Sequence, residues 1–242
     1  MSHQSIRFGD TTINYEVRRS ERRKKTVQIT VNGSGVLVQA PAGCPDREVQ
    51  AFVRKKAAWI IHHSTQASLT ASPRLFISGE TLPYLGRNLR LIVNSSPDVR
   101  TPQVHFDHWR FHIEAPEDLI GPERIERIRR AFIKWYRTRA ADRLPDRTDR
   151  WLPRFPTKVQ PRVFIRDQRL RWASCSPDGT IRFNWRVMML KPTLIDYIIV
   201  HELAHLTIKN HSTPYWNLVS HVMPDAQTRR QHLKETGRHL PL

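Results

Sequence analysis

Residues 192–208 read PTLIDYIIVHELAHLTI, and this stretch decides the fold of the C-terminal half of the chain. Its body is apolar almost all round, which is typical of a central, buried helix. Pro192 and Thr193 indicate where that helix begins. Thr193 and Asp196 resemble a capping box, with Asp in place of the usual Glu. The sequence therefore predicts a buried helix over residues 193–208.

An H-E-x-x-H motif lies within this predicted helix, as His201, Glu202 and His205. Residues four apart share one face of a helix, so both imidazoles can reach one ion. Zinc held by three protein ligands keeps an open position and lowers the pKa of a bound water to about 7. Glu202 is placed to take the proton of that zinc-bound water. The motif predicts a hydrolase with one Zn²⁺, for which another divalent ion is an alternative.

The third ligand has to come from beyond the helix. Asn210 is a suitable stop because Asn tolerates the left-handed conformation, and Ser212 can cap a following helix. His211 then lies between two helices and is the favoured third ligand. A downstream carboxylate is the alternative, and the candidates are Asp225 and Glu235.

The chain from residue 171 onward resembles the YgjP-like metallopeptidase domain family, zincin-like metal-dependent hydrolases. The matching segments occur in order and at the family's spacings. They are Arg171–Ser176, Arg182–Arg186, His201–Leu206, Asn210–Ser212 and Tyr215–Trp216. The resemblance implies that His201, His205 and His211 bind the metal and that Glu202 is the general base.

The N-terminal half also resembles the family. It has a basic segment before a hairpin, a helix ending in Trp59-Ile60, and Leu85-Gly86-Arg87. One departure is Ala173, where the family's loop usually has Gly. The family's names imply a peptidase, and a nucleotide pyrophosphatase activity is also attached to it, so the resemblance leaves the substrate open.

Four further residues are candidates for roles beside the metal. Arg171 could stabilise an oxyanion or hold a phosphate, although its loop could equally be structural. Asn184 could orient a metal ligand or only bond the backbone. Tyr215 could donate to an oxyanion or pack between helices. Cys175 could be a ligand or nucleophile, but a lone Cys is more often a small buried residue.

The N-terminal part is predicted to be a sheet with one helix. Residues 27–31 and 36–38 alternate as a hairpin around Asn32–Gly35, and residues 45–61 have helical periodicity. Further strands are expected at 81–85, 89–93 and 104–113, the last turning at Asp107-His108. His105, His108 and His112 are predicted to be surface residues of that hairpin rather than a second metal site.

From Pro122 a long helix is expected, which the proline-rich stretch 144–161 should interrupt. Strands through Val163 and through Ile181 follow, joined by a basic loop and a turn. We place the domain boundary near residue 118. The predicted fold class is α+β, with an N-terminal β-hairpin, sheet-and-helix domain at 1–117 and a zincin-like metal-binding hydrolase domain at 118–242.

Composition limits the classes that remain. The 242 residues contain two cysteines, no apolar run near the ~20 residues of a membrane helix, and no signal segment at the start. We expect a cytoplasmic protein with reduced thiols and no membrane partner. The net charge of +18 favours anionic partners, including nucleic acid. The densest group, called here the basic cluster, comprises Arg18, Arg19, Arg22, Arg23, Lys24 and Lys25; it could bind a polyanion or be a solvated hairpin tip.

Three functions remain open. A peptidase should have a sheet edge beside the zinc helix, for which Ile181 to Trp185 is the candidate strand. A nucleotide pyrophosphatase should have Arg and Lys converging on the zinc. A nucleic-acid-binding protein with structural zinc should have four protein ligands and a shared basic face.

Overall fold

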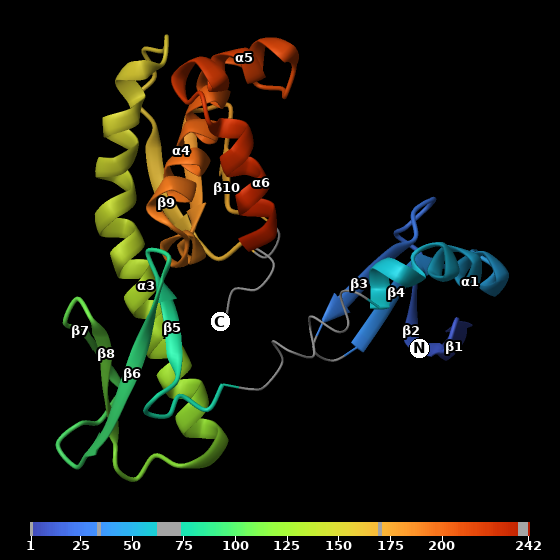
Figure 1. The fold of residues 1–242 in the computed structure, drawn as a ribbon, viewed down its shortest axis with the longest axis horizontal. Coiled ribbons are helices and arrows are strands. Elements are labelled where there is room, and N and C mark those ends of the chain that lie inside the picture. Colours follow the sequence, from blue (N-terminus) through green and yellow to red (C-terminus); the bar gives the residue numbers. More distant parts are fainter. Residues whose placement is uncertain (1, 33–34, 62–73, 169–170, 237–241) are drawn as a thin grey trace. The chain divides into compact units, whose positions relative to one another are not determined.

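The computed structural model describes residues 2–32, 35–61, 74–168, 171–236 and 242, and it is a mixed α+β protein (Figure 1). The chain divides into two compact units, Met1–Arg74 and Leu75–Leu242. Each unit has its own hydrophobic core. They are therefore described separately.

The first unit is a four-stranded sheet with a helix. Its elements are β1 (Ser2–Phe8), β2 (Thr11–Ser20), β3 (Gln28–Asn32), β4 (Gly35–Pro41) and α1 (Asp46–Lys55). The strand order is β1-β2-β4-β3, in which β2 and β4 run parallel and the other pairs antiparallel. Val17 and Val38 of the sheet are buried in one cluster with Val49 and Val53 of α1.

Sequence patterning predicts only part of this sheet. The β3–β4 hairpin is confirmed, although residues 33–34 of its turn lie outside the described residues. The helix begins after Pro45, as predicted. Strands β1 and β2 were not predicted, and β2 separates β1 from β4.

The second unit begins with another four-stranded sheet. Its strands are β5 (Thr81–Tyr84), β6 (Arg87–Ser96), β7 (Gln103–Phe106) and β8 (Arg110–Pro116), in the order β5-β6-β8-β7. The predicted turn between β7 and β8 is confirmed. Asp107 Oδ1 accepts from the backbone N–H of Trp109 and of Arg110, at 2.8 and 2.7 Å. His105 and His112 face each other across this hairpin, and His112 bonds Asp107.

Helix α3 (Gly121–Trp151) is longer than the sequence predicts. It ends within the proline-rich stretch 144–161, as expected, but only at Trp151, after continuing through Pro145. Leu144 and Thr148, on either side of the proline, are both fully buried, and Thr148 donates to the Leu144 carbonyl at 2.7 Å. Packing on both sides of Pro145 thus offsets the backbone hydrogen bond that the proline removes.

The remaining elements surround the motif helix. They are β9 (Arg162–Arg166), β10 (Ala173–Cys175), β11 (Thr180–Asn184), the 3-10 turn η2 (Trp185–Met189), α4 (Pro192–Thr207), α5 (Thr213–Val222) and α6 (Ala226–Thr236). The strand order is β10-β11-β9. Strand β11 therefore lies in the middle of its sheet, so the prediction that Ile181 to Trp185 forms an edge is wrong. The edges are β9 and β10, and the edge that contacts α4 is β10, which was expected to be a loop.

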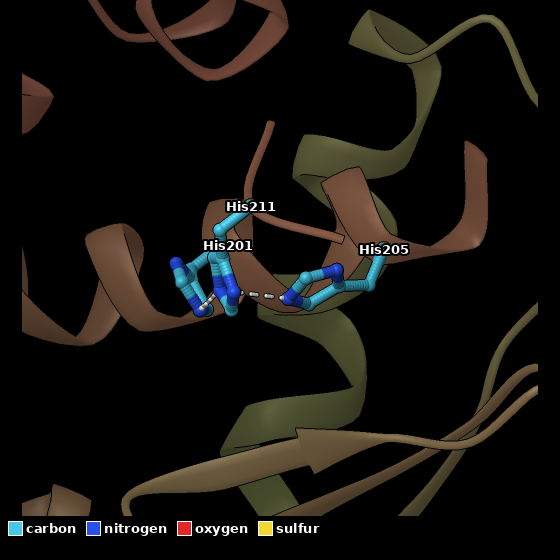
Figure 2. Close-up of side chains that lie close together, drawn as sticks. All are labelled: His201, His205 and His211. Atoms are coloured by element: carbon cyan, nitrogen blue, oxygen red, sulfur yellow. Dashed lines mark hydrogen bonds between the residues drawn. The ribbon is translucent and has the colours of Figure 1, made fainter. Parts of the chain in front are cut away.

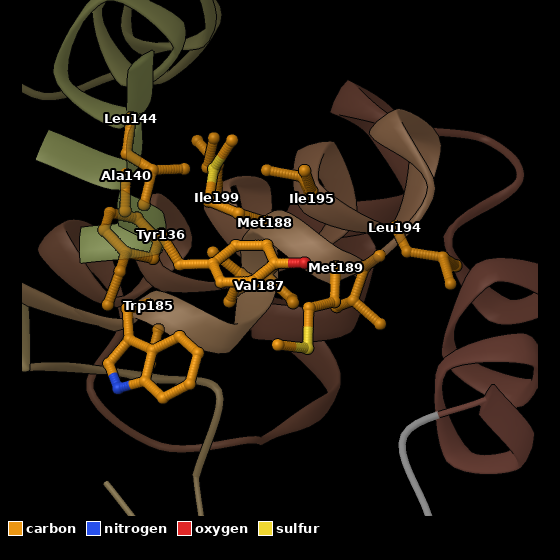
Figure 3. Packing of buried hydrophobic residues seen from close by; sticks show 14 of the residues in the cluster. Tyr136, Ala140, Leu144, Trp185, Val187, Met188, Met189, Leu194, Ile195 and Ile199 are labelled. Carbon is orange, nitrogen blue, oxygen red and sulfur yellow. The ribbon is translucent and has the colours of Figure 1, made fainter. Parts of the chain in front are cut away.

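One core joins all of these elements. It contains Leu91 and Phe111 of the β5–β8 sheet, Phe132 of α3 and Ile199 of α4. Figure 3 shows side chains of α3, η2 and α4 packed together. The predicted boundary near residue 118 differs from the division at residues 74 and 75, because the sheet β5–β8 packs on α3 in this same core.

Helix α4 is buried along most of its length, as predicted, but its ends differ. Lys191 is the N-cap residue, with no side-chain cap, so the predicted capping box at Thr193 is wrong. Asp196 instead accepts from Arg147, at 2.6 and 2.9 Å, and from Trp151 Nε1 at 2.8 Å, which ties α4 to α3. None of the described helices combines the length and apolar character that a membrane crossing requires.

Candidate metal centre

Three imidazoles converge at the C-terminal end of α4 (Figure 2). His201 and His205 lie one turn apart on α4, and His211 comes from the segment between α4 and α5. His211 Nε2 lies 3.1 Å from His201 Nε2 and 3.2 Å from His205 Nε2. Among the described residues, these three form the group of His, Cys, Asp or Glu that could hold a metal ion.

The spacing of the nitrogens fits a tetrahedral ion. Zinc–nitrogen bonds of ~2.0–2.1 Å place two ligands of a tetrahedron about 3.3 Å apart. The observed separations of 3.1 and 3.2 Å are close to this value. Imidazole nitrogen also suits zinc and several other transition metals. The three side chains are therefore able to hold such an ion, with room for a further ligand.

Hydrogen bonds on the far side of two rings favour this role. His205 Nδ1 lies 3.0 Å from the Ile208 carbonyl, which can only accept, so Nδ1 carries the proton. Tyr215 Oη lies 2.7 Å from His201 Nδ1 and 2.9 Å from the His201 carbonyl. If His201 Nδ1–H donates to the phenol and the phenol donates to the carbonyl, every partner is satisfied. The Nε2 lone pairs of His201 and His205 then face the three-histidine cluster.

Tyr215 is fully buried and bonds His201 on the side away from the cluster. Its ring also stacks on His205, with centroids 4.6 Å apart. These contacts combine the predicted packing role with a positioning role. They leave the hydroxyl engaged rather than free for an oxyanion.

The end of α4 brings His211 into place. Helix α4 ends at Thr207, and Ile208 follows in an extended conformation. Asn210 has no positive φ, so the predicted left-handed stop at Asn210 is wrong. Ser212 is the N-cap residue of α5, as predicted, but its side chain makes no cap bond.

The carboxylates considered as alternative ligands are engaged elsewhere on α6 and just before it. Asp225 accepts from Arg229 at 2.8 Å. Glu235 accepts from Gln231 at 2.8 Å. Neither belongs to the cluster that could hold a metal.

Burial sets the protonation of the site. Burial, together with the charges of His205, His211 and Arg230, lowers the pKa of His201 to about 3. Burial likewise lowers the pKa of His205. Both imidazoles are neutral at pH 7, the form that binds metals.

Glu202 is buried, with 6% of its surface exposed. Burial raises its pKa to about 7, although the Cys175 backbone N–H and the charge of Arg171 act in the opposite direction. A carboxyl group with such a pKa can both accept and release a proton near neutral pH.

A cavity of about 660 Å³ opens beside the cluster. Its lining comes from β10 and the residues on either side of it, from α4 and the segment that follows it, and from α6. The lining residues are Arg171, Trp172, Ala173, Ser174, Cys175, Pro177, Tyr197, Ile198, His201, Glu202, His205, Lys209, His211, Arg230, Leu233 and Lys234.

Two of the other predicted candidates also lie in this cavity and one does not. Arg171 and Cys175 line it. Asn184 is buried outside the lining, and its Nδ2 donates to the carbonyls of Gln168 and Arg171, at 2.6 and 3.2 Å. Asn184 therefore bonds the backbone of the loop that carries Arg171, the second of its two predicted roles. Residues 169–170 of this loop lie outside the described residues.

Several lining residues were not predicted. Tyr197 precedes His201 by four residues, so its place on the same helix face could have been read from the sequence. The sequence gives no comparable indication that the cavity is lined by Lys209, Arg230 and Lys234. Arg230 reaches the site because α6 packs against α4, which is a tertiary contact.

The basic cluster belongs to the first unit and is partly engaged there. Arg19 donates to Asp46 at 2.6 Å. Arg23 donates to Gln28 and Gln39 at 2.9 and 2.8 Å. Arg19 therefore ties β2 to the start of α1, and Arg23 bonds both β3 and β4.

Comparison with known proteins gives one family. Residues 25–236 match the profile described as YgjP-like, metallopeptidase domain. A search of curated proteins gives no match.

Among solved structures, the metallopeptidase zymogen of Pyrococcus abyssi abylysin is similar at 26% identity and a TM-score of 0.35, covering 40% of this chain and 97% of that one. The metallopeptidase zymogen of Methanocaldococcus jannaschii jannalysin is similar at 24% identity and a TM-score of 0.35, covering 38% and 93%. These TM-scores are too low to argue a shared fold. The sequence match spans most of the chain and carries the assignment.

Proposed function

The chain belongs to the YgjP-like metallopeptidase domain family, and we propose on this premise that it is a zinc-dependent hydrolase with a zincin-like C-terminal unit. The observation that carries the proposal is the convergence of three Nε2 atoms at 3.1 and 3.2 Å beside a buried carboxyl group. His201, His205 and His211 would hold the ion.

The ion, when bound, supplies Lewis acidity that makes water a nucleophile near neutral pH and polarises the bond under attack. Glu202 accepts the proton of the attacking water at its carboxylate and delivers it to the leaving group. The Cys175 backbone N–H fixes the orientation of that carboxylate, and Tyr215 fixes the ring of His201. Burial keeps bulk water away from the carboxylate.

A peptide is the first candidate substrate. Strand β10 pairs with β11 on one side, and its other side pairs with no strand among the described residues. Its three residues, Ala173, Ser174 and Cys175, line the cavity beside α4. An extended peptide can add to such an edge through main-chain hydrogen bonds. This edge supports a peptidase.

A nucleotide is the second candidate. Arg171, Lys209, Arg230 and Lys234 line the same cavity as the histidines, which is the convergence of cations that a nucleotide pyrophosphatase requires. A structural zinc in a nucleic-acid-binding protein has less support. Among the described residues, the cluster has three ligands and not the four of a closed site.

The test compares Glu202→Gln with Glu235→Gln in the zinc-loaded full chain. Glu235 lies on α6 outside the cavity and undergoes the same chemical change. A peptide library and a panel of nucleoside triphosphates are assayed. We expect hydrolysis of one class to fall about 10²–10⁴-fold in Glu202→Gln and to be unchanged in Glu235→Gln. Hydrolysis of neither class, or hydrolysis that does not depend on Glu202, would overturn the proposal.

A further inference from the structure

The cavity beside the histidines has an excess of positive charge. Four of its lining residues are cations, Arg171, Lys209, Arg230 and Lys234, and one is a carboxylate, Glu202. None of the four cations has an ion-pair partner in the part of the chain that the structure describes. The cavity therefore presents unneutralised charge to whatever enters it.

Arg230 is the cation whose position is most firmly fixed. Its guanidinium lies over the Trp216 ring, 4.5 Å from the centroid. The Trp216 ring in turn stacks on His211, with centroids 5.7 Å apart and planes 27° apart. A guanidinium stacked on an aromatic face is held in place while its N–H groups remain available to donate. Arg230 thus stands one aromatic ring away from the metal cluster.

Arg229, the preceding residue of α6, is an arginine whose donors are already used in hydrogen bonds within the protein. Arg229 donates to Asp225 at 2.8 Å and to the Thr193 carbonyl at 3.0 Å. It does not line the cavity. A chain of net charge +18 has many cations on its surface, but Arg230 differs from a solvated one because it is half-buried, stacked and inside the cavity.

A second donor lines the same cavity. Tyr197 lies one turn before His201 on α4, and its hydroxyl makes no hydrogen bond with another described residue. Burial raises the pKa of this phenol, while Arg230 lowers it, so Arg230 lies within electrostatic range of the hydroxyl. The phenol is protonated at neutral pH and can donate.

We propose that Arg230 is a specificity-determining residue that binds an anionic oxygen group of the substrate, a carboxylate or a phosphoryl group, beside the histidine cluster. Arginine binds both groups through paired N–H donors. The inference rests on the proposed hydrolase function, because the bound molecule is the substrate of that hydrolase. It concerns how the substrate binds and not the chemical step. An acidic peptide and a nucleotide are the two sources of such a group.

The experiment measures binding to the zinc-loaded full chain carrying Glu202→Gln, so that turnover does not interfere. One pair of probes is acetyl-Ala-Asp-Ala-Asp-Ala-amide and its Asn counterpart, and the other pair is ATP and adenosine. Calorimetry gives each Kd in this background and with Arg230→Gln or Arg229→Gln added. The two variants remove the same charge from adjacent positions of one helix.

We expect one anionic probe to bind at least tenfold more tightly than its neutral counterpart. Arg230→Gln should abolish that preference, and Arg229→Gln should keep it. The pair that shows the preference identifies a carboxylate or a phosphoryl group as the ligand. No preference in either pair, an unchanged preference in Arg230→Gln, or an equal loss in both variants would overturn the inference.

A second measurement does not use Arg230→Gln, so it tests the inference even if that variant fails to fold. In the Glu202→Gln background alone, the preference should fall as salt rises from 50 to 500 mM, because screening weakens a charge–charge contact. A preference independent of salt would contradict the inference. Hydrolysis without any anionic preference would remove the inference and leave the proposed function. Arg230-dependent binding without hydrolysis would remove the proposed function and leave the inference about Arg230.

Discussion

Tyr215→Phe should weaken zinc binding while leaving the fold intact. The substitution removes one oxygen from a fully buried ring, so it leaves little space unfilled. The ring that stacks on His205 at 4.6 Å remains. The His201 Nδ1 group, 2.7 Å from the lost oxygen, is left without its partner in a half-buried place.

The size of the effect follows from that lost partner. An unsatisfied buried donor costs about 1–3 kcal/mol, and about 1.4 kcal/mol corresponds to a factor of ten in an equilibrium constant. Loss of an outer hydrogen bond to a metal-binding histidine typically costs 10–100-fold in affinity. The two approaches agree, so we expect the zinc Kd of Tyr215→Phe to rise by about one to two orders of magnitude.

The assay is competition for zinc between the full chain and a chromophoric chelator. Tyr197→Phe is the matched control, because its hydroxyl lines the cavity but bonds no other described residue. We expect the control to bind zinc as the unsubstituted chain does. An unchanged Kd in Tyr215→Phe, or an equal loss in Tyr197→Phe, would refute the reasoning that Tyr215 positions His201.

Three further predictions concern the second unit. Asp196→Asn should lower its free energy of unfolding by about 1.5–3 kcal/mol, since Arg147 and Trp151 both donate to this half-buried carboxylate; Asp142→Asn, in an exposed pair at 3.9 Å, should cost less than about 0.5 kcal/mol in the same urea titration. Gly86→Ala should cost about 1–3 kcal/mol, because φ is +77° and the new Cβ would lie 2.9 Å from Lys191 Cα; Gly121→Ala, with φ +59° and nothing within 4 Å, should cost less in the same titration. Burial raises the pKa of Cys175 to about 11, so in metal-free Cys44→Ser only about one thiol in a thousand is thiolate at pH 8. Alkylation by iodoacetamide should accelerate as pH rises, with a midpoint near that pKa, and a midpoint below pH 9 would contradict this.

The metal centre is predictable because its geometry is local. Residues four apart in the sequence lie on the same face of a helix, so His201 and His205 come together whatever surrounds the helix. His211 follows at a distance that one chain reversal covers, and the structure brings it to the cluster. The reversal itself was predicted at the wrong residue, because Ile208 in an extended conformation ends the hydrogen-bonding pattern before Asn210.

The errors share a cause, which is the dominance of tertiary contacts over local pattern. Asp196 is three residues from Thr193, as a capping box requires, but Arg147 and Trp151, more than forty residues earlier in the chain, bind it instead. Pro145 should interrupt a helix, but the core holds α3 on both sides of it. Strand β10 has three residues, too few to show an alternating pattern, and only its pairing with β11 defines it. Arg230 reaches the cavity through packing of α6 on α4.

The most direct test of the central claim is the zinc content of the purified full chain and of His211→Ala, measured by mass spectrometry after zinc loading and gel filtration. The geometry of the three Nε2 atoms predicts one zinc per unsubstituted chain, one per Glu202→Gln chain, and a loss in His211→Ala. Zinc retained in full by His211→Ala, or absent from the unsubstituted chain, would contradict a three-histidine metal centre.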